Sequence, residues 1–422
     1  MDFTRLSDQD YQAFVAAQER CFYTQLPVYG DVREAEGFTV ERVGLVHNGD
    51  VRGVATIVYQ PWKKLFRRAV VPYGPVIDWN DRDLVRSFFE HLISWVERDR
   101  KVLTLRVNPL LKRREYRDIS PIKTNENAGF FETVMEDLGA ERVTKEFYES
   151  SDIQVRFAYV KDLASMDYDA AVASCHQTVR TAFRKAGANG VTVKFLGPED
   201  FHILENVMTH TAERTAMERV APAMMSYYRD LMARMGPEGV LLPAAILSCP
   251  DALGQIAEER ELVTAEIATL EALERAAHEQ DRHLGKKQRN RLKELRSRVE
   301  VLDRRANETE AIRSEYGDDV VLSASLFVHS PHELVYLISG SYAQFQSYSG
   351  IYLIHRAMIE WALERDVRWY NMFGITGDFT SDASDAGVLH FKRQFNGDVE
   401  EYVGTYDIPL RKCLASALNA VG

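Results

Sequence analysis

The segment between residues 255 and 313 constrains the fold most strongly, because its apolar residues follow the spacing of a coiled coil. In the second half they recur at alternating steps of three and four residues, which predicts the seam of a two-stranded coiled coil. These positions are Leu292, Leu295, Val299, Leu302, Ala306 and Thr309. The first half has a matching row, made of Ile256, Val263, Ile267, Leu270 and Ala277. His283, Leu284 and Gly285 interrupt the pattern where the chain would reverse, so we expect an antiparallel helical hairpin.

The charge of this hairpin changes sign near its tip. Residues 255–281 carry eight acids and two bases, whereas residues 282–298 carry eight bases and one acid. A basic tip suits contact with a polyanion, and the candidate residues are Lys286, Lys287, Arg289 and Arg291. Alternatively, the acidic first helix pairs with the basic second helix, and such hairpins also serve as spacers or dimer contacts. The hairpin alone leaves these alternatives open.

Length and composition predict a globular protein of two or three domains, since the chain has 422 residues. A net charge of −11 argues against a general nucleic-acid coat protein but allows a local basic patch. The cysteines form no CxxC motif, so we expect a reducing compartment and no metal site. These are Cys21, Cys175, Cys249 and Cys413. No signal region or apolar run long enough for a transmembrane segment is evident, which predicts a cytoplasmic protein that could dock peripherally at the membrane.

Two parts of the chain repeat one order of elements. Residues 43–58 and residues 320–338 each predict two strands joined by a turn. Each is followed by an amphipathic helix and a strand, at residues 88–109 and 354–374. The repeat predicts two copies of one α/β unit, with the coiled coil inserted in the second copy.

The repeated unit resembles the acetyltransferase (GNAT) fold. The predicted fold class is therefore α/β (α+β), with two tandem GNAT-like domains and an inserted antiparallel coiled-coil hairpin. The predicted boundaries are 1–150, completed by 398–422, for the first domain; 151–250 and 314–397 for the second; and 251–313 for the arm. The nearest match to a coenzyme A phosphate loop, residues 184–190, has its second glycine one place late. No cofactor is predicted.

Several segments resemble the Fem (FemABX) family of aminoacyl-tRNA-dependent peptidyltransferases. They cover nearly the whole chain in the expected order: 71–78 with 105–109, 178–191, 348–397 and 401–410. The resemblance implies an enzyme that moves an amino acid from its tRNA to an amine of the peptidoglycan stem peptide. The implied partners are aminoacyl-tRNA, as a cosubstrate, and a peptidoglycan precursor, either UDP-MurNAc-pentapeptide or a lipid-linked form.

The resemblance also implies substrate-binding residues. Arg180 and Arg184 lie in the family's basic motif, and the planar fork of Arg180 suits a diphosphate. Arg33 is the second clamp candidate, where the family has lysine. Tyr228 lies in an aromatic segment that the family places near the acceptor, although helix packing would also explain an aromatic residue there.

The remaining candidates concern the reaction itself. Lys392 stands where the family has a functional lysine near the ester, and it would stabilise an oxyanion or bind the phosphate of the terminal adenosine. Its neighbour Phe391 either stacks on a base or packs in the core. Asn108 departs from the aspartate of some members and cannot accept a proton at neutral pH. The base is then another group, and the candidate acids are Asp378, Asp382 and Asp385. Alternatively, the tRNA ribose hydroxyl shuttles the proton.

Two other functions remain open. The same fold could aminoacylate another acceptor, such as a protein N-terminus, an antibiotic precursor or a lipid. A non-catalytic tRNA-binding protein is the other alternative, in which Asn108 marks lost chemistry.

Overall fold

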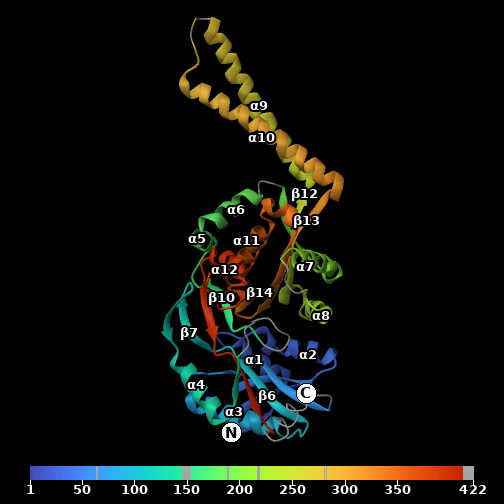
Figure 1. The fold of residues 1–422 in the computed structure, drawn as a ribbon, viewed down its shortest axis with the longest axis vertical. Helices are drawn as coiled ribbons and strands as arrows, with labels where there is room; N and C mark the ends of the chain where they lie inside the picture. The colour runs from blue at the N-terminus through green and yellow to red at the C-terminus, as the bar shows by residue number, and fades with distance from the viewer. Residues whose placement is uncertain are drawn as a thin grey trace.

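The computed structural model describes residues 1–62, 65–144, 154–187, 190–215, 219–279, 281 and 283–411. Two β-sheets form the body, and a long helical hairpin projects from the second sheet (Figure 1). Cys413, Arg282, Ala188 and Asn189 lie outside the described residues. None of the described helices is both long enough and apolar enough to cross a membrane.

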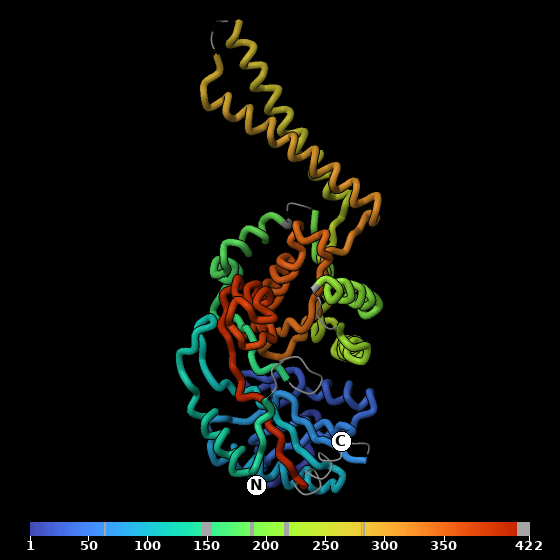
Figure 2. Tube along the Cα trace, in the orientation of Figure 1, coloured from blue at the N-terminus to red at the C-terminus, as the bar shows by residue number. Residues whose placement is uncertain are grey.

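The first sheet has the strand order β1-β2-β3-β4-β6-β17-β9, and β5 pairs with β3. Its strands are β1 (Asp2–Arg5), β2 (Thr39–His47), β3 (Asp50–Trp62), β4 (Phe66–Tyr73), β5 (Val76–Ile77), β6 (Val102–Pro109), β9 (Glu141–Val143) and β17 (Thr405–Pro409). The tube in Figure 2 shows the C-terminal strand returning from the second unit into this sheet, where it pairs with β6.

The second sheet has the order β11-β12-β13-β14-β15-β10-β16-β7-β8. Its strands are β7 (Lys112–Arg117), β8 (Ser120–Thr124), β10 (Phe157–Asp162), β11 (Val191–Leu196), β12 (Val240–Ser248), β13 (Asp319–Ser330), β14 (Glu333–Ser341), β15 (Trp369–Ile375) and β16 (Asp398–Tyr402). The chain crosses between the sheets at 112–124 and at 398–409, so strand pairing does not follow the expected domain limits there. Those limits remain a prediction.

Each sheet contains one parallel pair whose strands are joined by a crossover helix. In the first sheet α3 (Arg82–Val96) joins β4 to β6, and in the second α11 (Gly350–Leu363) joins β14 to β15. The predicted hairpins β2–β3 and β13–β14 are confirmed, as are the helix and strand that follow in each unit. The first unit has an additional strand, β4, between its hairpin and its crossover helix. The strand equivalent to β14 is therefore β4 and not β3, which differs from the predicted repeat.

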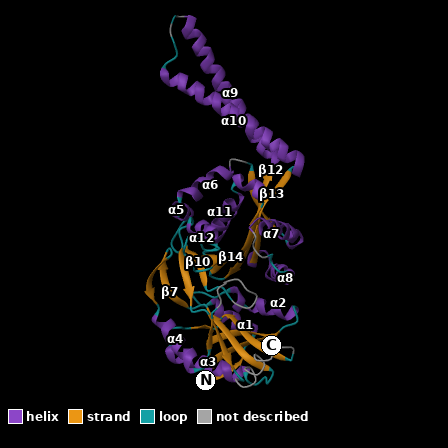
Figure 3. Ribbon diagram, in the orientation of Figure 1, coloured by secondary structure: helices purple, strands orange, loops and turns teal. Residues whose placement is uncertain are grey.

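Helices cover the outer faces of both sheets and fill the space between them (Figure 3). The shorter ones are α1 (Asp8–Ala16), α2 (Pro27–Ala35), α4 (Glu126–Asp137), α5 (Tyr168–Ser174), α6 (Gln177–Gly187), α7 (Phe201–Thr215), α8 (Pro222–Gly239) and α12 (Ala386–Arg393). One apolar cluster joins residues of α1, α2, α7 and α8 to both sheets, including Phe22, Tyr73, Tyr227 and Tyr402. The two units therefore share a buried core, in which apolar residues of each unit are covered by residues of the other.

The hairpin consists of α9 (Cys249–Glu279) and α10 (Lys286–Tyr316) and connects β12 to β13. Four predicted seam positions of α10 are buried: Leu292, Leu295, Leu302 and Thr309. Ion pairs cross between the helices: Arg291–Glu266, Arg296–Glu271, Arg298–Glu259 and Arg260–Asp303. Pairing of the acidic first helix with the basic second helix, one of the alternatives that the sequence left open, therefore accounts for part of the charge pattern.

Candidate active site

Lys392 lies inside the second unit, where two parallel strands cease to pair. Strands β14 and β15 pair only from Glu333 and Trp369 to Val335 and Asn371. Beyond that point, the Lys392 Nζ donates a hydrogen bond to the carbonyl oxygen of Gly374 at 2.5 Å. Its side chain comes from α12 and is only 5% exposed. Lys392 is therefore not a solvated surface lysine.

A group of aromatic rings includes the neighbour of this lysine in sequence, Phe391, and a histidine that is close enough to sense its charge. Phe391 is half-buried, and its ring lies 5.4 Å from both Tyr352 and His355. His355 is fully buried, and its Nδ1 lies 2.7 Å from the Tyr370 hydroxyl. Burial, together with the nearby charge of Lys392, lowers the pKa of His355 to about 3. The imidazole is thus neutral at physiological pH and adds no second cation beside Lys392.

The acids proposed as replacement bases differ in their surroundings. Asp385 is buried, and its carboxylate accepts hydrogen bonds from the Thr376 N–H at 2.7 Å and the Thr376 hydroxyl at 2.6 Å. Asp378 and Asp382 are exposed and accept hydrogen bonds from Thr380 N–H and the Ser381 hydroxyl. Asp385 therefore fixes the start of the stretch that leads into α12.

Asn108 is buried and supports an unusual backbone conformation. Its Oδ1 accepts a hydrogen bond from the Tyr73 N–H at 3.2 Å, and Tyr73 has φ +53°. A positive φ is costly for an aromatic residue and needs such support. Asn371 does the same in the second unit, because its Oδ1 accepts from the N–H of Phe373, where φ is +63°. This geometry favours a positioning role for Asn108.

A buried ionic network connects the two units, and the sequence did not reveal it. The Arg20 guanidinium bridges Glu333 and Glu400, and Lys112 bonds Glu400 at 2.6 Å. Asn371 Nδ2 also donates to Glu333, at 2.7 Å. Burial alone would raise the pKa of Glu400, but the Arg20 and Lys112 cations outweigh it and lower the pKa to about 2.

Arg33 and Tyr228 are brought together at the contact of α2 with α8. The Arg33 guanidinium lies 2.6 Å from the Glu36 carboxylate, 4.3 Å from the Phe38 ring and 5.4 Å from the Tyr227 ring. Tyr227 is in turn 5.4 Å from Tyr228, which is half-buried. One cation and several aromatic faces therefore share one surface.

Arg180 and Arg184 lie elsewhere, on α6. Arg180 donates to the Ala173 carbonyl at 3.2 Å and to Gln177 Oε1 at 2.7 Å, and Arg184 is exposed. Figure 1 shows α6 near the base of the hairpin and α2 on the opposite flank. The two expected diphosphate clamps, Arg180 and Arg33, thus do not converge on one point in this structure.

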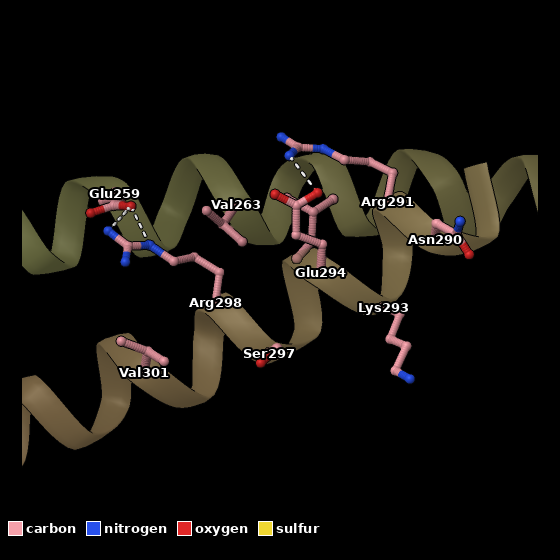
Figure 4. A pocket seen from close by; sticks show the side chains of 10 residues that line it. Glu259, Val263, Asn290, Arg291, Lys293, Glu294, Ser297, Arg298 and Val301 are labelled. Carbon is pink, nitrogen blue, oxygen red and sulfur yellow. Dashed lines mark hydrogen bonds and ion pairs between the residues drawn. The ribbon is translucent and has the colours of Figure 1, made fainter. Parts of the chain in front are cut away.

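The basic tip of the hairpin divides into paired and unpaired residues. Arg291 bonds Glu266 at 2.8 and 2.9 Å and contacts Glu294, whereas Lys286, Lys287 and Arg289 are exposed without an ion pair to any described residue. In Figure 4 Arg298 reaches across to Glu259, while Lys293 points away from the other helix. Four of the side chains that line the groove drawn there are engaged in ion pairs: Glu259, Arg291, Glu294 and Arg298.

In the part of the chain that the structure describes, no group of three or more His, Cys, Asp or Glu side chains is placed so that it could hold a metal ion.

Comparison with known proteins defines the class of enzyme. The chain is 28% identical to aminoacyltransferase FemA of Staphylococcus aureus strain MW2, over 100% of this chain and 98% of the relative. FemA of strain N315 matches with the same identity and coverage. The crystal structure of FemX superposes with a TM-score of 0.80 at 18% identity and covers 99% of each chain, which confirms the fold class. The protein is an aminoacyltransferase.

The particular family follows from a separate match. The FemAB family model matches residues 6–422, which is nearly the whole chain. The chain belongs to the FemAB family.

Proposed function

We propose that the protein transfers an amino acid from aminoacyl-tRNA to the stem-peptide amine of a peptidoglycan precursor and so builds the interpeptide bridge. The acceptor is UDP-MurNAc-pentapeptide or its lipid-linked form. The observation that carries this proposal is the position of Lys392, a buried cation beside the end of the β14–β15 pairing in a FemAB chain. The reaction takes place in the cytoplasm, with peripheral docking at the membrane where the acceptor is lipid-linked.

The reaction is aminolysis of an ester that is already activated. The amine nitrogen attacks the ester carbon, a tetrahedral oxyanion forms, and the ribose oxygen leaves as the amide is made. A fixed cation at the developing oxyanion lowers this barrier more than it stabilises the substrate. Lys392 is suited to that role, or to holding the terminal adenosine, because its ammonium is already desolvated and directed by the Gly374 carbonyl.

Proton removal does not need a protein base in this scheme. Asn108 is an amide that cannot accept a proton at neutral pH. Both carboxylate oxygens of Asp385 accept hydrogen bonds from Thr376. A free lysine amine has a pKa of about 10.4, so its ammonium first releases one proton to solvent and the neutral amine attacks. The hydroxyl of the terminal ribose is adjacent to the ester and can relay the second proton, which the attacking nitrogen then releases, to the leaving oxygen.

The acceptor is held by cationic and aromatic residues. Arg33 and Tyr228 form one such surface, which suits a diphosphate and a sugar or uracil ring. Arg180 and Arg184 supply a second cationic site on α6. Phe391 is half-exposed beside Lys392 and suits stacking on the terminal base.

The hairpin tip is proposed to contact the tRNA. Lys286, Lys287 and Arg289 are exposed and unpaired among the described residues, whereas Arg291 mainly joins the two helices. The tip therefore offers fewer free cations than the sequence suggests.

A transfer assay tests the proposal. Purified full-length protein would be incubated with total aminoacyl-tRNA carrying labelled amino acids and, separately, with UDP-MurNAc-pentapeptide and a lipid-linked precursor. Mass analysis should find the precursor heavier by one or more aminoacyl residues. Loss of the ester without a labelled precursor would instead favour a different acceptor, and no consumption of charged tRNA would favour a non-catalytic tRNA-binding protein.

A further inference from the structure

An arginine cluster surrounds one buried carboxylate at the seam between the sheets. Arg156 Nη2 bonds Glu401 Oε1 at 2.7 Å, Arg113 reaches the same oxygen at 3.4 Å, and Arg114 lies 3.7 Å from Glu401 Oε2. Arg142 lies alongside, because a Cβ at Gly404 would be 3.8 Å from both Arg142 and Arg156. We call Arg113, Arg114, Arg142 and Arg156 the Glu401 cluster.

The backbone gathers these side chains. Strands β16 and β7 pair Glu401 with Arg114 and Tyr402 with Lys112, so Arg113 is the additional residue of a β-bulge. A bulge redirects side chains, and here two consecutive arginines reach the same carboxylate. Gly404 has φ +93°, which lets the chain turn closely past Arg142 and Arg156.

The charge of the cluster is not balanced by the carboxylates that the structure places in it. Glu401 and Glu132 face four guanidinium groups, which leaves an excess of two positive charges among these residues. Burial lowers the pKa of Arg142, and the proximity of Arg156 and Arg113 lowers it further. Like charges held this close repel one another, and a bound anion relieves the repulsion.

Not every donor of the cluster is held by Glu401. The Arg156 Nε is buried without a hydrogen-bond partner in the described structure. Arg114 lies beyond hydrogen-bond distance of Glu401, and its side chain is 41% exposed. Guanidinium forks of this kind match the paired oxygens of a phosphate.

The cluster is connected to the helix that carries Lys392 in two ways. Tyr116 donates to Glu401 at 2.9 Å, and its ring lies 6.1 Å from Phe379, which is in the stretch leading into α12. At the other end of α12, Arg393 pairs with Asp118 in the β7–β8 turn. These contacts join β7 and the turn after it to the stretch before α12 and to the last residue of α12, the helix on which Lys392 is the proposed position of the terminal ester.

Building on the proposed function, we infer that the Glu401 cluster binds backbone phosphates in the 3′-terminal segment of the tRNA. Glu401 is the positioning residue, since from a buried site it accepts hydrogen bonds from Arg156 and Arg113 and forms an ion pair with Arg114. The cluster is a separate surface from the hairpin tip, and it lies on the body of the protein.

The test uses full-length protein and deacylated total bacterial tRNA, with binding followed by fluorescence anisotropy over a salt series. Arg114→Glu should weaken binding about tenfold and reduce the slope of log K against log salt by about 0.7–0.9. Arg114→Lys keeps the charge but loses the fork, so we expect an intermediate affinity. Arg117→Glu is the matched control, because Arg117 is an exposed residue of the same strand outside the cluster, and it should change binding less than about twofold.

Equal loss in Arg114→Glu and Arg117→Glu would overturn the inference, because it would show a general charge effect. Unchanged tRNA binding with a raised KM for UDP-MurNAc-pentapeptide would assign the cluster to the precursor instead and would also overturn it. Circular dichroism and thermal unfolding verify that each variant is folded. Because deacylated tRNA undergoes no transfer, wild-type binding without transfer activity would count against the proposed function alone.

Discussion

Lys392 donates a 2.5 Å hydrogen bond to the Gly374 carbonyl from inside the protein, although a lysine beside an arginine in a basic segment suggests a surface position. Burial of an ammonium costs free energy, so its retention here points to a use for the charge. The carbonyl also fixes the direction of Nζ.

Replacing Lys392 with methionine should lower kcat for transfer by roughly a hundredfold or more, because a preorganised cation at the oxyanion is removed. Methionine has a similar length and suits a buried site. Arg393→Gln is the matched control, since it removes the neighbouring cation from an exposed ion pair, and it should retain most activity. Rates are measured with charged tRNA and UDP-MurNAc-pentapeptide. Near-normal kcat in Lys392→Met would contradict a catalytic role.

Replacing Asn108 with alanine should reduce the free energy of unfolding by about 1–3 kcal/mol, because the buried Tyr73 N–H loses its acceptor. Asn108→Asp keeps an oxygen acceptor, so it should lose less stability than the alanine variant. Urea unfolding measures both, and Asn307→Ala, at an exposed position of α10, serves as the control. An Asn108→Ala protein as stable as wild type would show that the Tyr73 backbone needs no support.

The parts of the fold that could be predicted well from the sequence depend on local patterns. The hairpin seam repeats every few residues, and Leu292, Leu295 and Leu302 are buried as that period requires. The helices and strands around residues 88–109 and 354–374 have similarly clear periodicity. The motif around Lys392 indicates a functional residue, whereas the burial of Lys392 depends on how α12 packs against β15, which no local pattern encodes.

The features that the sequence did not reveal join residues far apart in the chain. Arg20 is 313 residues from Glu333 and 380 from Glu400, so no spacing rule relates them. The same holds for the strands at 112–124, which pair in the second sheet because β16 passes beside them. Pairing of Arg291 with Glu266 was open in the sequence, since charge alone does not distinguish a helix partner from a ligand.

Acid should destabilise the protein through Glu400. The folded-state pKa of about 2 lies below the ordinary value of 4.5, so the carboxylate contributes stability above pH 4.5 that is lost as pH falls from 4.5 toward 2. The full contribution is about 3 kcal/mol as an upper bound. Glu400→Gln should remove this part of the pH dependence and lower stability at neutral pH, since Arg20 and Lys112 lose a partner.

Urea midpoints measured between pH 2 and 7 check the Glu400 prediction. Glu364→Gln is the control, because its side chain is exposed and, among the residues that the structure describes, pairs only with the neighbouring Arg365. The control should follow the wild-type curve at every pH. If Glu400→Gln also follows the wild-type slope between pH 4.5 and 2, another group carries the acid sensitivity.

Charge reversal should separate the two roles of the hairpin's basic residues. The triple variant Lys286→Glu, Lys287→Glu, Arg289→Glu should weaken tRNA binding and reduce the salt slope by about 0.9 for each phosphate that the tip no longer neutralises. These side chains have no ion pair among the described residues, so the hairpin should stay folded. Arg291→Glu should instead disturb the pairing of α9 with α10, because it places two carboxylates together at Glu266.

Combining Arg291→Glu with Glu266→Arg restores the opposite charges across the hairpin. If Arg291 serves mainly the helix pair, the double variant should recover the thermal stability of the wild type, and its tRNA affinity should be close to normal. Arg304→Glu, which is exposed near the base of α10, controls for net charge and should change tRNA binding little. Persistently weak tRNA binding in the restored pair would show that Arg291 itself contacts the tRNA.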